Sequence, residues 1–138
     1  MSTNLSAGMG DPYWYEWLIG VYYALDMLAP DNDIEYVTLQ ASEFQGLDDV
    51  VIGYKSGEIT GIQVKHTRDN NSLTFNNLIY STSGKISLLA ELFNDWKKIW
   101  ESGLYTHCNA LLLTNRKGGI RNSTIGKASK NPVALPAL

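Results

Sequence analysis

Residues 46–66 read GLDDVVIGYKSGEITGIQVKH, and the fold of the chain can be inferred outward from this stretch. Two apolar runs, at residues 50–54 and 59–64, flank residues 55–57, Lys-Ser-Gly, which have the composition of a tight turn. Two apolar runs joined in this way predict a β-hairpin. The hairpin is central to the interpretation because the polar residues best suited to chemistry lie on it.

Those polar residues are Asp49, at the start of the first strand, and Gln63 and Lys65 in the second. Side chains alternate between the two faces of a strand, so Gln63 and Lys65 share one face while Ile62 and Val64 occupy the other. Carboxylate and amide oxygens are ligands that Mg²⁺ accepts, and a lysine beside such an ion can stabilise charge on a phosphate or help to activate water. The hairpin therefore predicts that an acid, an amide and an amine converge around a divalent cation.

The 138-residue chain has the composition of one globular domain, with 44% apolar and 18% charged residues. No apolar run is long enough to span a membrane, and residues 1–10 lack the regions of a signal peptide, so we expect a cytoplasmic protein. The single cysteine, Cys108, lies in an apolar run and is expected to be a small buried residue. One cysteine and two histidines offer no ligand spacing for zinc.

The net charge of −3 hides an uneven distribution along the chain. Residues 1–115 contain all 14 acidic residues, and residues 116–138 contain five basic residues and no acid: Arg116, Lys117, Arg121, Lys127 and Lys130. We therefore predict a core domain at residues 1–115 and a basic tail or linker at 116–138. An acidic body binds phosphate poorly, so recognition of a nucleic acid needs a local basic surface, which the tail can supply.

Hydrophobic periodicity predicts the elements around the hairpin. In chain order they are a helix at residues 11–29, a strand at 34–40, the two hairpin strands, a helical turn within 73–80, a helix at 85–102 and a strand at 107–115. Asp11 and Pro12 mark the start of the first helix, and Ser72 or Thr74 is the candidate cap of the helical turn. The order predicts an α/β fold with an αβββαβ core.

The same patterns predict burial. Both faces of the first helix are apolar, so we expect it to be covered on two sides, and residues 107–115 resemble a strand buried on both faces. In the second long helix the predicted buried stripe is Ile86, Leu89, Phe93, Trp96 and Trp100. Glu16 lies within an apolar face of the first helix, where it either meets a cation or donors or remains a partly exposed acid favoured by the helix dipole.

Together these residues resemble the D-(x)n-(D/E/Q)-x-K signature of the PD-(D/E)xK nuclease superfamily, whose restriction-endonuclease-like core is a mixed sheet flanked by helices in the order αβββαβ. Within that superfamily the chain looks most similar to the N-terminal endonuclease domains of bacterial anti-phage effectors, including the CD-NTase-associated endonuclease of CBASS systems. The similarity is carried by DPYWYEWLIGVYYALDML with Glu16, LDDVVI with Asp48 and Asp49, IQVKH with Gln63, Lys65 and His66, LTFNNLI, and LLAELFNDWKKIW.

The resemblance implies Mg²⁺-dependent hydrolysis of phosphodiester bonds in double-stranded DNA, with Mn²⁺ as a substitute metal. Asp49 is then the principal metal ligand and Gln63 the second, while Lys65 stabilises the phosphate or orients water. Glutamine supplies one negative charge fewer than the glutamate that is common at this position, so Glu16 or Glu43 is expected to compensate. Of the two adjacent aspartates, Asp49 is preferred as ligand because it shares its strand face with Val51 and Gly53 and leads directly into the apolar strand.

The resemblance also implies DNA as partner, no membrane association, the ability to form a homo-oligomer, and an activating or sensor domain downstream of the chain. His66 should face away from Lys65 and is expected to have a structural role. The rival hypothesis is a catalytically inactive domain of nuclease fold that binds nucleic acid or a protein partner. In that case the tryptophans and tyrosines of the first helix form an oligomer interface.

Overall fold

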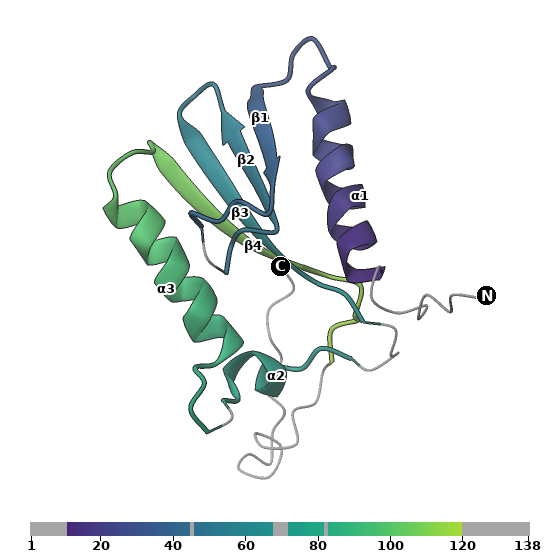
Figure 1. Cartoon of the computed structure of the whole chain (residues 1–138), viewed down its shortest axis with the longest axis vertical. Helices are drawn as coiled ribbons and strands as arrows, with labels where there is room; N and C mark the ends of the chain where they lie inside the picture. The colour runs from purple at the N-terminus through teal and green to yellow at the C-terminus, as the bar shows by residue number, and fades with distance from the viewer. Residues whose placement is uncertain (1–10, 45, 68–71, 82, 120–138) are drawn as a thin grey trace, which may run out of the picture.

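The computed structural model describes residues 11–44, 46–67, 72–81 and 83–119. Its elements are α1 (Asp11–Asp26), β1 (Ile34–Leu39), β2 (Val50–Tyr54), β3 (Glu58–Lys65), α2 (Phe75–Ile79), α3 (Leu88–Glu101) and β4 (His107–Thr114). The strands form one sheet, with α1 against one face and α3 against the other (Figure 1). The predicted α/β fold, with helices on both sides of a sheet, is confirmed.

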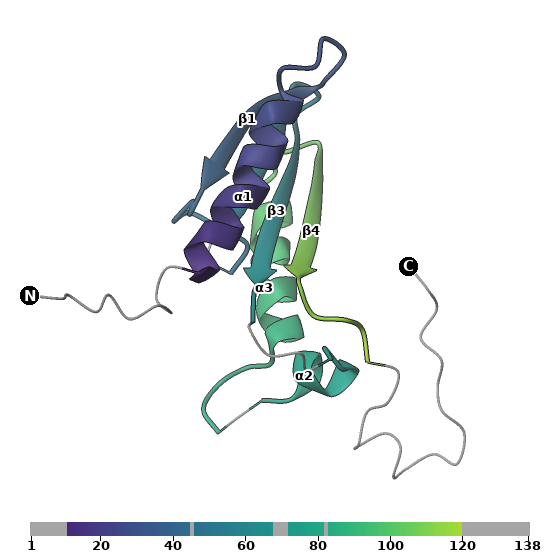
Figure 2. The same cartoon turned by 90° about the vertical axis from the view of Figure 1, so that its right-hand side faces the viewer.

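The sheet is mixed, with strand order β1-β2-β3-β4. β1, β2 and β3 are antiparallel neighbours, whereas β3 and β4 are parallel. The parallel pair requires a long crossover, and α2 and α3 provide it (Figure 2). The hairpin predicted from residues 46–66 is present, with Val50 opposite Ile62. This register brings the residues that precede β2 beside the end of β3.

Side-chain caps determine where the two later helices begin. The Thr74 side chain accepts a hydrogen bond from the backbone N–H of Asn77, and the Asn77 side chain accepts one from the Thr74 backbone, which forms a capping box for α2. Of the two predicted candidates, Ser72 and Thr74, the cap is therefore Thr74. The Ser87 hydroxyl accepts from the N–H of Ala90 at 3.3 Å, so α3 begins at Leu88, three residues after the predicted start.

The two faces of the sheet carry separate apolar clusters. On the α1 side, Tyr15, Ile19 and Tyr23 of the helix pack on buried strand residues that include Val50, Ile52, Ile62 and Val64. On the α3 side, Leu92 and Ile99 of the helix pack with Leu47, Val51, Ile59 and Cys108. Val50 and Val51 face opposite ways, as the alternation of a strand requires. The burial predicted for Cys108 is confirmed.

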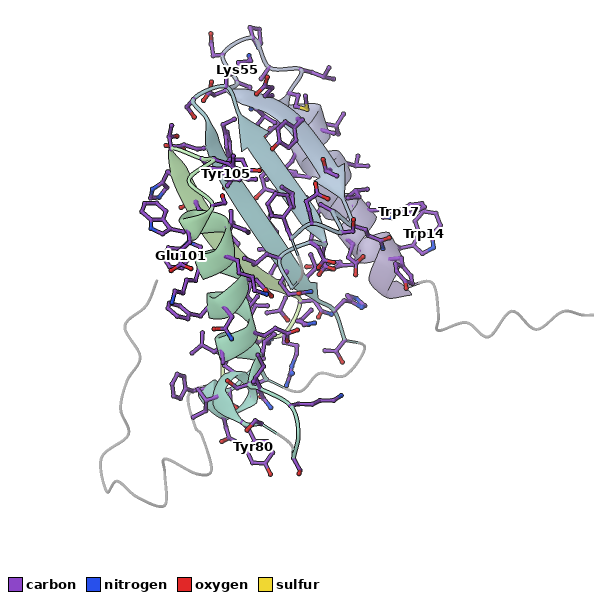
Figure 3. All side chains as sticks on the ribbon, turned by 60° about the vertical axis from the view of Figure 1, so that its left-hand side comes forward. Trp14, Trp17, Lys55, Tyr80, Glu101 and Tyr105 are labelled. Carbon is purple, nitrogen blue, oxygen red and sulfur yellow. The ribbon has the colours of Figure 1, made fainter. Side chains whose placement is uncertain are left out.

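The predicted burial of the two long helices was wrong in part. α1 is covered on one side only: Trp14, Leu18 and Leu25 are each more than 60% exposed, and Trp14 and Trp17 point away from the sheet (Figure 3). α1 forms an outer layer, so only its Tyr15–Ile19–Tyr23 side meets the strands. In α3 the buried positions are Leu92, Asp95 and Ile99, and of the predicted more aromatic stripe only Trp96 packs against the core.

The last strand was also expected to be buried on both faces, and this was wrong. β4 is an edge strand of the sheet, and of its eight residues only Cys108 is buried. Trp96 of α3 covers it from one side and donates its indole N–H to the Cys108 carbonyl oxygen at 2.8 Å. A continuous apolar run is therefore not sufficient to place a strand in the middle of a sheet.

The described chain continues beyond β4 to residue 119. Leu73 pairs with Gly118 in an isolated parallel bridge, and the Arg116 guanidinium donates to the Ser72 carbonyl oxygen at 2.7 Å. The first residues of the predicted tail therefore contact the segment before α2. The expected loose start at residues 1–10 and the rest of the basic tail, from residue 120, lie outside the described residues. No described helix has the length and apolarity needed to cross a membrane.

Candidate active site

Asp49 lies in the turn immediately before β2, and the hairpin register holds its carboxylate against the end of β3. Its Oδ2 atom accepts a hydrogen bond from the backbone N–H of Val64 at 2.6 Å and another from the side-chain amide of Gln63. The carboxylate is half-buried. Because Val50 is paired with Ile62, Asp49 lies beside residues 63 and 64 without any distortion of the ladder. The predicted approach of Asp49 to Gln63 is therefore present.

Gln63 and Lys65 lie on the strand face predicted for them. Ile62 and Val64 belong to the cluster under α1, so the intervening Gln63 points to the other face, where it is 8% exposed. Lys65 is the last residue of β3 and is exposed, and its positive charge partly offsets the rise in the pKa of the Asp49 carboxyl that burial causes. A buried amide and an exposed amine thus flank the same carboxylate.

Glu16 approaches this group from α1. Burial raises the pKa of Glu16 above its usual value, and the nearby charge of Asp49 raises it further. The charge of Lys65 and a hydrogen bond from Gln40 act in the opposite direction. Of the two acids proposed to compensate for the neutral glutamine, Glu16 is therefore the one close enough to interact with Asp49.

Among the described residues, the negative charges that act on Asp49 and Glu16 outnumber the positive ones. Burial raises the pKa of Asp49 above its usual value, and the charge of Asp48 adds to that effect, although hydrogen bonds from Val64 and Gln63 and the charge of Lys65 oppose it. Glu16, Asp48 and Asp49 thus interact electrostatically around one lysine. A divalent cation is the group that such a set of oxygens would favour.

The donor set fits Mg²⁺ better than it fits a fully protein-caged ion. The described residues contain no cluster of three or more His, Cys, Asp or Glu residues able to hold a metal. Mg²⁺ is commonly held by one or two carboxylates and completes its shell with water and substrate phosphate. Asp49 and Glu16 supply carboxylates of that kind, and the amide of Gln63 carries a further oxygen.

The raised pKa of Asp49 leads to a testable prediction about stability. The folded state binds the Asp49 proton more tightly than the unfolded chain does. Protonation of this carboxyl therefore stabilises the fold as pH falls from the raised pKa towards 3.8. At pH 7 the charged carboxylate lowers the free energy of unfolding. Asp49→Asn removes the charge and retains an oxygen for the Val64 N–H. We expect its melting temperature to exceed that of the wild type at pH 7 and the difference to shrink below pH 4.

The matched control for this prediction is Asp31→Asn, which removes a charge from an exposed turn. Its melting temperature should stay close to that of the wild type across the same pH range. Thermal unfolding of the three proteins, followed by circular dichroism in a metal-free buffer, provides the comparison. A lower melting temperature for Asp49→Asn than for the wild type at pH 7 would show that the Asp49 charge stabilises the fold.

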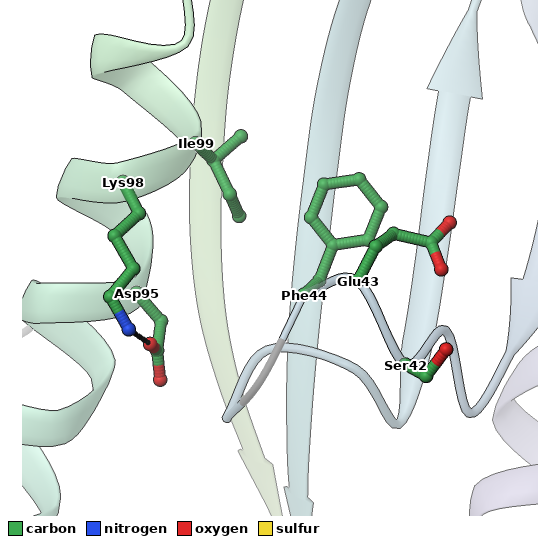
Figure 4. A pocket seen from close by; sticks show the side chains of 6 residues that line it. All are labelled: Ser42, Glu43, Phe44, Asp95, Lys98 and Ile99. Atoms are coloured by element: carbon green, nitrogen blue, oxygen red, sulfur yellow. Dashed lines mark hydrogen bonds and ion pairs between the residues drawn. The ribbon is translucent and has the colours of Figure 1, made fainter.

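Glu43 does not belong to the group of residues around Asp49. It lines a separate small pocket of about 110 Å³ together with Ser42, Phe44, Asp95, Lys98 and Ile99 (Figure 4). The carboxylate of Asp95 is buried there and is paired with Lys98 at 3.0 Å. Burial raises the pKa of Tyr105 and the charge of Glu43 adds to that rise, whereas Glu43 is not among the groups that shift the pKa of Asp49 or Glu16. The structure therefore separates Glu43 from the group around Asp49.

Two residues near the site were not recognised from the sequence. Gln40 directly follows β1 and donates from its side chain to the Glu16 carboxylate at 3.5 Å, but nothing in its sequence neighbourhood distinguishes it from an ordinary exposed residue. Tyr15 packs its ring on His66, with 4.9 Å between ring centroids. The structural role expected for His66 is in keeping with this contact, which links α1 to the end of β3 next to Glu16 and Lys65.

Comparison with known proteins adds one finding to this geometry. The family model described as Cap4, dsDNA endonuclease domain, matches residues 10–128, which is most of the chain. The chain belongs to this family. Searches of curated proteins and of solved structures gave no significant match.

Membership of the Cap4 family confirms the resemblance inferred from the sequence and identifies the domain as a nuclease domain of the double-stranded DNA endonuclease type. The match includes α1 with Glu16 and the hairpin with Asp49, Gln63 and Lys65, and it extends past β4. The boundary at residue 115 between core and tail remains a prediction. The roles of the individual residues are likewise a matter for proposal.

Proposed function

We propose that this domain is a Mg²⁺-dependent endonuclease that hydrolyses phosphodiester bonds of double-stranded DNA. The observation that carries the proposal is the hydrogen bond from the Gln63 amide to the Asp49 carboxylate at the end of one hairpin, at a position where the charge of Lys65 acts on the same carboxylate. Family membership supports DNA cleavage, and the surplus of negative charge around Lys65 supports the divalent cation. The family match and the charges of the site are independent observations.

In the proposed mechanism the residues have separate tasks. Asp49, Gln63 and Glu16 would hold the cation, and the Val64 N–H fixes the orientation of Asp49. A bound Mg²⁺ supplies charge neutralisation of the phosphate and lowers the pKa of water. The exposed Lys65 ammonium is free of the core and faces the phosphate, where it stabilises the charge that develops as water adds to phosphorus. The attacking water gives up a proton to the solvent, the bond from phosphorus to the leaving oxygen breaks, and that oxygen takes up a proton from the solvent.

The direct test is cleavage of a supercoiled plasmid in Mg²⁺, in Mn²⁺ and in EDTA, by the wild type and by Asp49→Ala. We expect nicked and linear products with the wild type in either metal and none in EDTA or with the variant. Circular dichroism establishes that the variant is folded. DNA binding by the wild type without cleavage in either metal, across a range of protein concentrations, would favour the inactive DNA-binding alternative instead.

We also propose that the domain is the effector of a bacterial anti-phage system, that it acts in the cytoplasm where the DNA is, and that it works within a homo-oligomer. A free nuclease would damage its own genome, so an activating or sensor domain downstream is part of the proposal. The support for this comes from the resemblance to anti-phage effectors and from the family match. Degradation of host or phage DNA by the full-length protein only in infected cells would be the corresponding observation.

A further inference from the structure

We propose that Gln40 is a positioning residue of the candidate active site, which holds the Glu16 carboxylate of α1 towards Asp49. The inference rests on the proposed function, because the position of Glu16 affects cation binding only if the site holds a cation. It goes beyond that function because no sequence motif includes Gln40.

The backbone at Gln40 is in an unusual conformation. Gln40 has φ of +50°, and it is the only non-glycine residue with positive φ in the described part of the chain. Side chains other than glycine, asparagine and aspartate rarely adopt this left-handed conformation, because the Cβ atom then approaches the following carbonyl oxygen. Strain of this kind persists where the surrounding structure enforces it, and it is often found at functional sites.

The strained conformation connects β1 to the turn that carries the aspartates. The Gln40 N–H donates to the Asp49 carbonyl oxygen at 3.1 Å, and the next N–H, of Ala41, donates to the Asp48 carbonyl oxygen at 2.9 Å. Gln40 is therefore attached through its backbone to the residue proposed as principal ligand. A glycine at this position would make the same two backbone contacts without strain.

The side chain of Gln40 provides what glycine cannot. Its Nε2 atom donates to Oε2 of Glu16 at 3.5 Å, across 24 positions of sequence and from the sheet to the helix. The carboxylates of Glu16 and Asp49 carry like charges and repel one another. The amide offsets part of this repulsion and keeps the acid near Asp49 before a cation arrives.

The experiment compares the wild type with Gln40→Gly, which removes the side chain and relieves the backbone. Thr38→Ala, at an exposed position of the same strand, is the control. Isothermal titration with Mn²⁺ in the absence of DNA gives the cation affinity, and thermal unfolding without metal gives the stability. We expect Gln40→Gly to melt at the wild-type temperature or above it and to bind Mn²⁺ about 3- to 10-fold more weakly.

A double-mutant cycle separates this inference from the proposed function. Melting temperatures of Glu16→Gln, Gln40→Gly and the double variant, measured without metal, report the contact whether or not a cation binds, and their changes should be non-additive. Unchanged Mn²⁺ affinity in Gln40→Gly, additive melting temperatures, or a large loss of stability in Gln40→Gly would each overturn the role of Gln40. If the wild type itself fails to bind Mn²⁺ while the cycle shows coupling, the proposed function fails and the contact stands.

Discussion

Replacing Lys65 with alanine is expected to lower the rate of Mg²⁺-dependent plasmid cleavage by about 100- to 1,000-fold, with the fold unchanged. Lys65 ends β3 and is exposed, so its removal creates no cavity. Its ammonium also partly offsets the rise in pKa that burial causes in both Glu16 and Asp49. The loss should appear in the single-turnover rate at saturating protein, because the proposed role is to stabilise charge in the transition state.

The control is Lys55→Ala. Lys55 is exposed at the turn of the same hairpin, at the end opposite Asp49 and Lys65, where its ammonium donates to the Asn32 carbonyl oxygen at 3.2 Å (Figure 3). Lys55→Ala removes one positive charge from the β2–β3 hairpin, as Lys65→Ala does. If both variants lose activity equally, and only through weaker DNA binding, Lys65 acts as a general phosphate contact and the catalytic assignment is wrong.

Leu47→Ala should produce the largest loss of stability among the substitutions considered, about 2–5 kcal/mol. Leu47 is fully buried in the turn before Asp48, and it packs in the α3-side cluster with Val51 and Ile59. It fits so closely against β3 that a Cβ atom built on Gly61 would lie 2.9 Å from the Leu47 Cβ. Truncation therefore leaves a cavity that neighbouring strands, fixed by their hydrogen bonds, can close only in part.

The predicted loss is a large fraction of the stability of a typical domain and corresponds to a melting temperature lower by about 10 to 20 °C. Urea unfolding followed by tryptophan fluorescence measures it directly. Leu104→Ala is the matched control, because Leu104 is 77% exposed after α3 and should change stability by less than about 0.5 kcal/mol. Equal unfolding midpoints for the two variants would show that the turn before Asp48 is not part of the cooperative core.

Much of the fold was predictable because local signals agreed with one another. The turn residues 55–57 between two apolar runs indicated the hairpin, and Thr74, one of the two candidate caps, marked the start of α2. Burial was less predictable, because periodicity shows that a helix has an apolar side without showing which apolar side meets the sheet. α1 has two such sides, and only packing against Val50 and Ile62 selects the one that carries Ile19.

The part of the candidate site that lies on the hairpin strands was predictable, because side chains alternate between the two faces of a strand. Gln63 and Lys65 were placed on one face by the period of two, and Asp49 by its position at the start of β2. The choice between Glu16 and Glu43 depends on how α1 lies over the end of the sheet, which no local pattern encodes. Gln40 was missed for a similar reason, since its positive φ results from the path of the chain between β1 and the turn before β2.

The parallel pairing of β3 with β4 has a consequence for the order of folding. β1, β2 and β3 are joined by short connections, whereas β4 can pair only after residues 66–106 have formed their crossover. Contacts between segments close in sequence form faster than contacts that must close a long loop. The ribbon that carries Asp49, Gln63 and Lys65 can therefore assemble on a growing chain before its C-terminal edge strand has been synthesised.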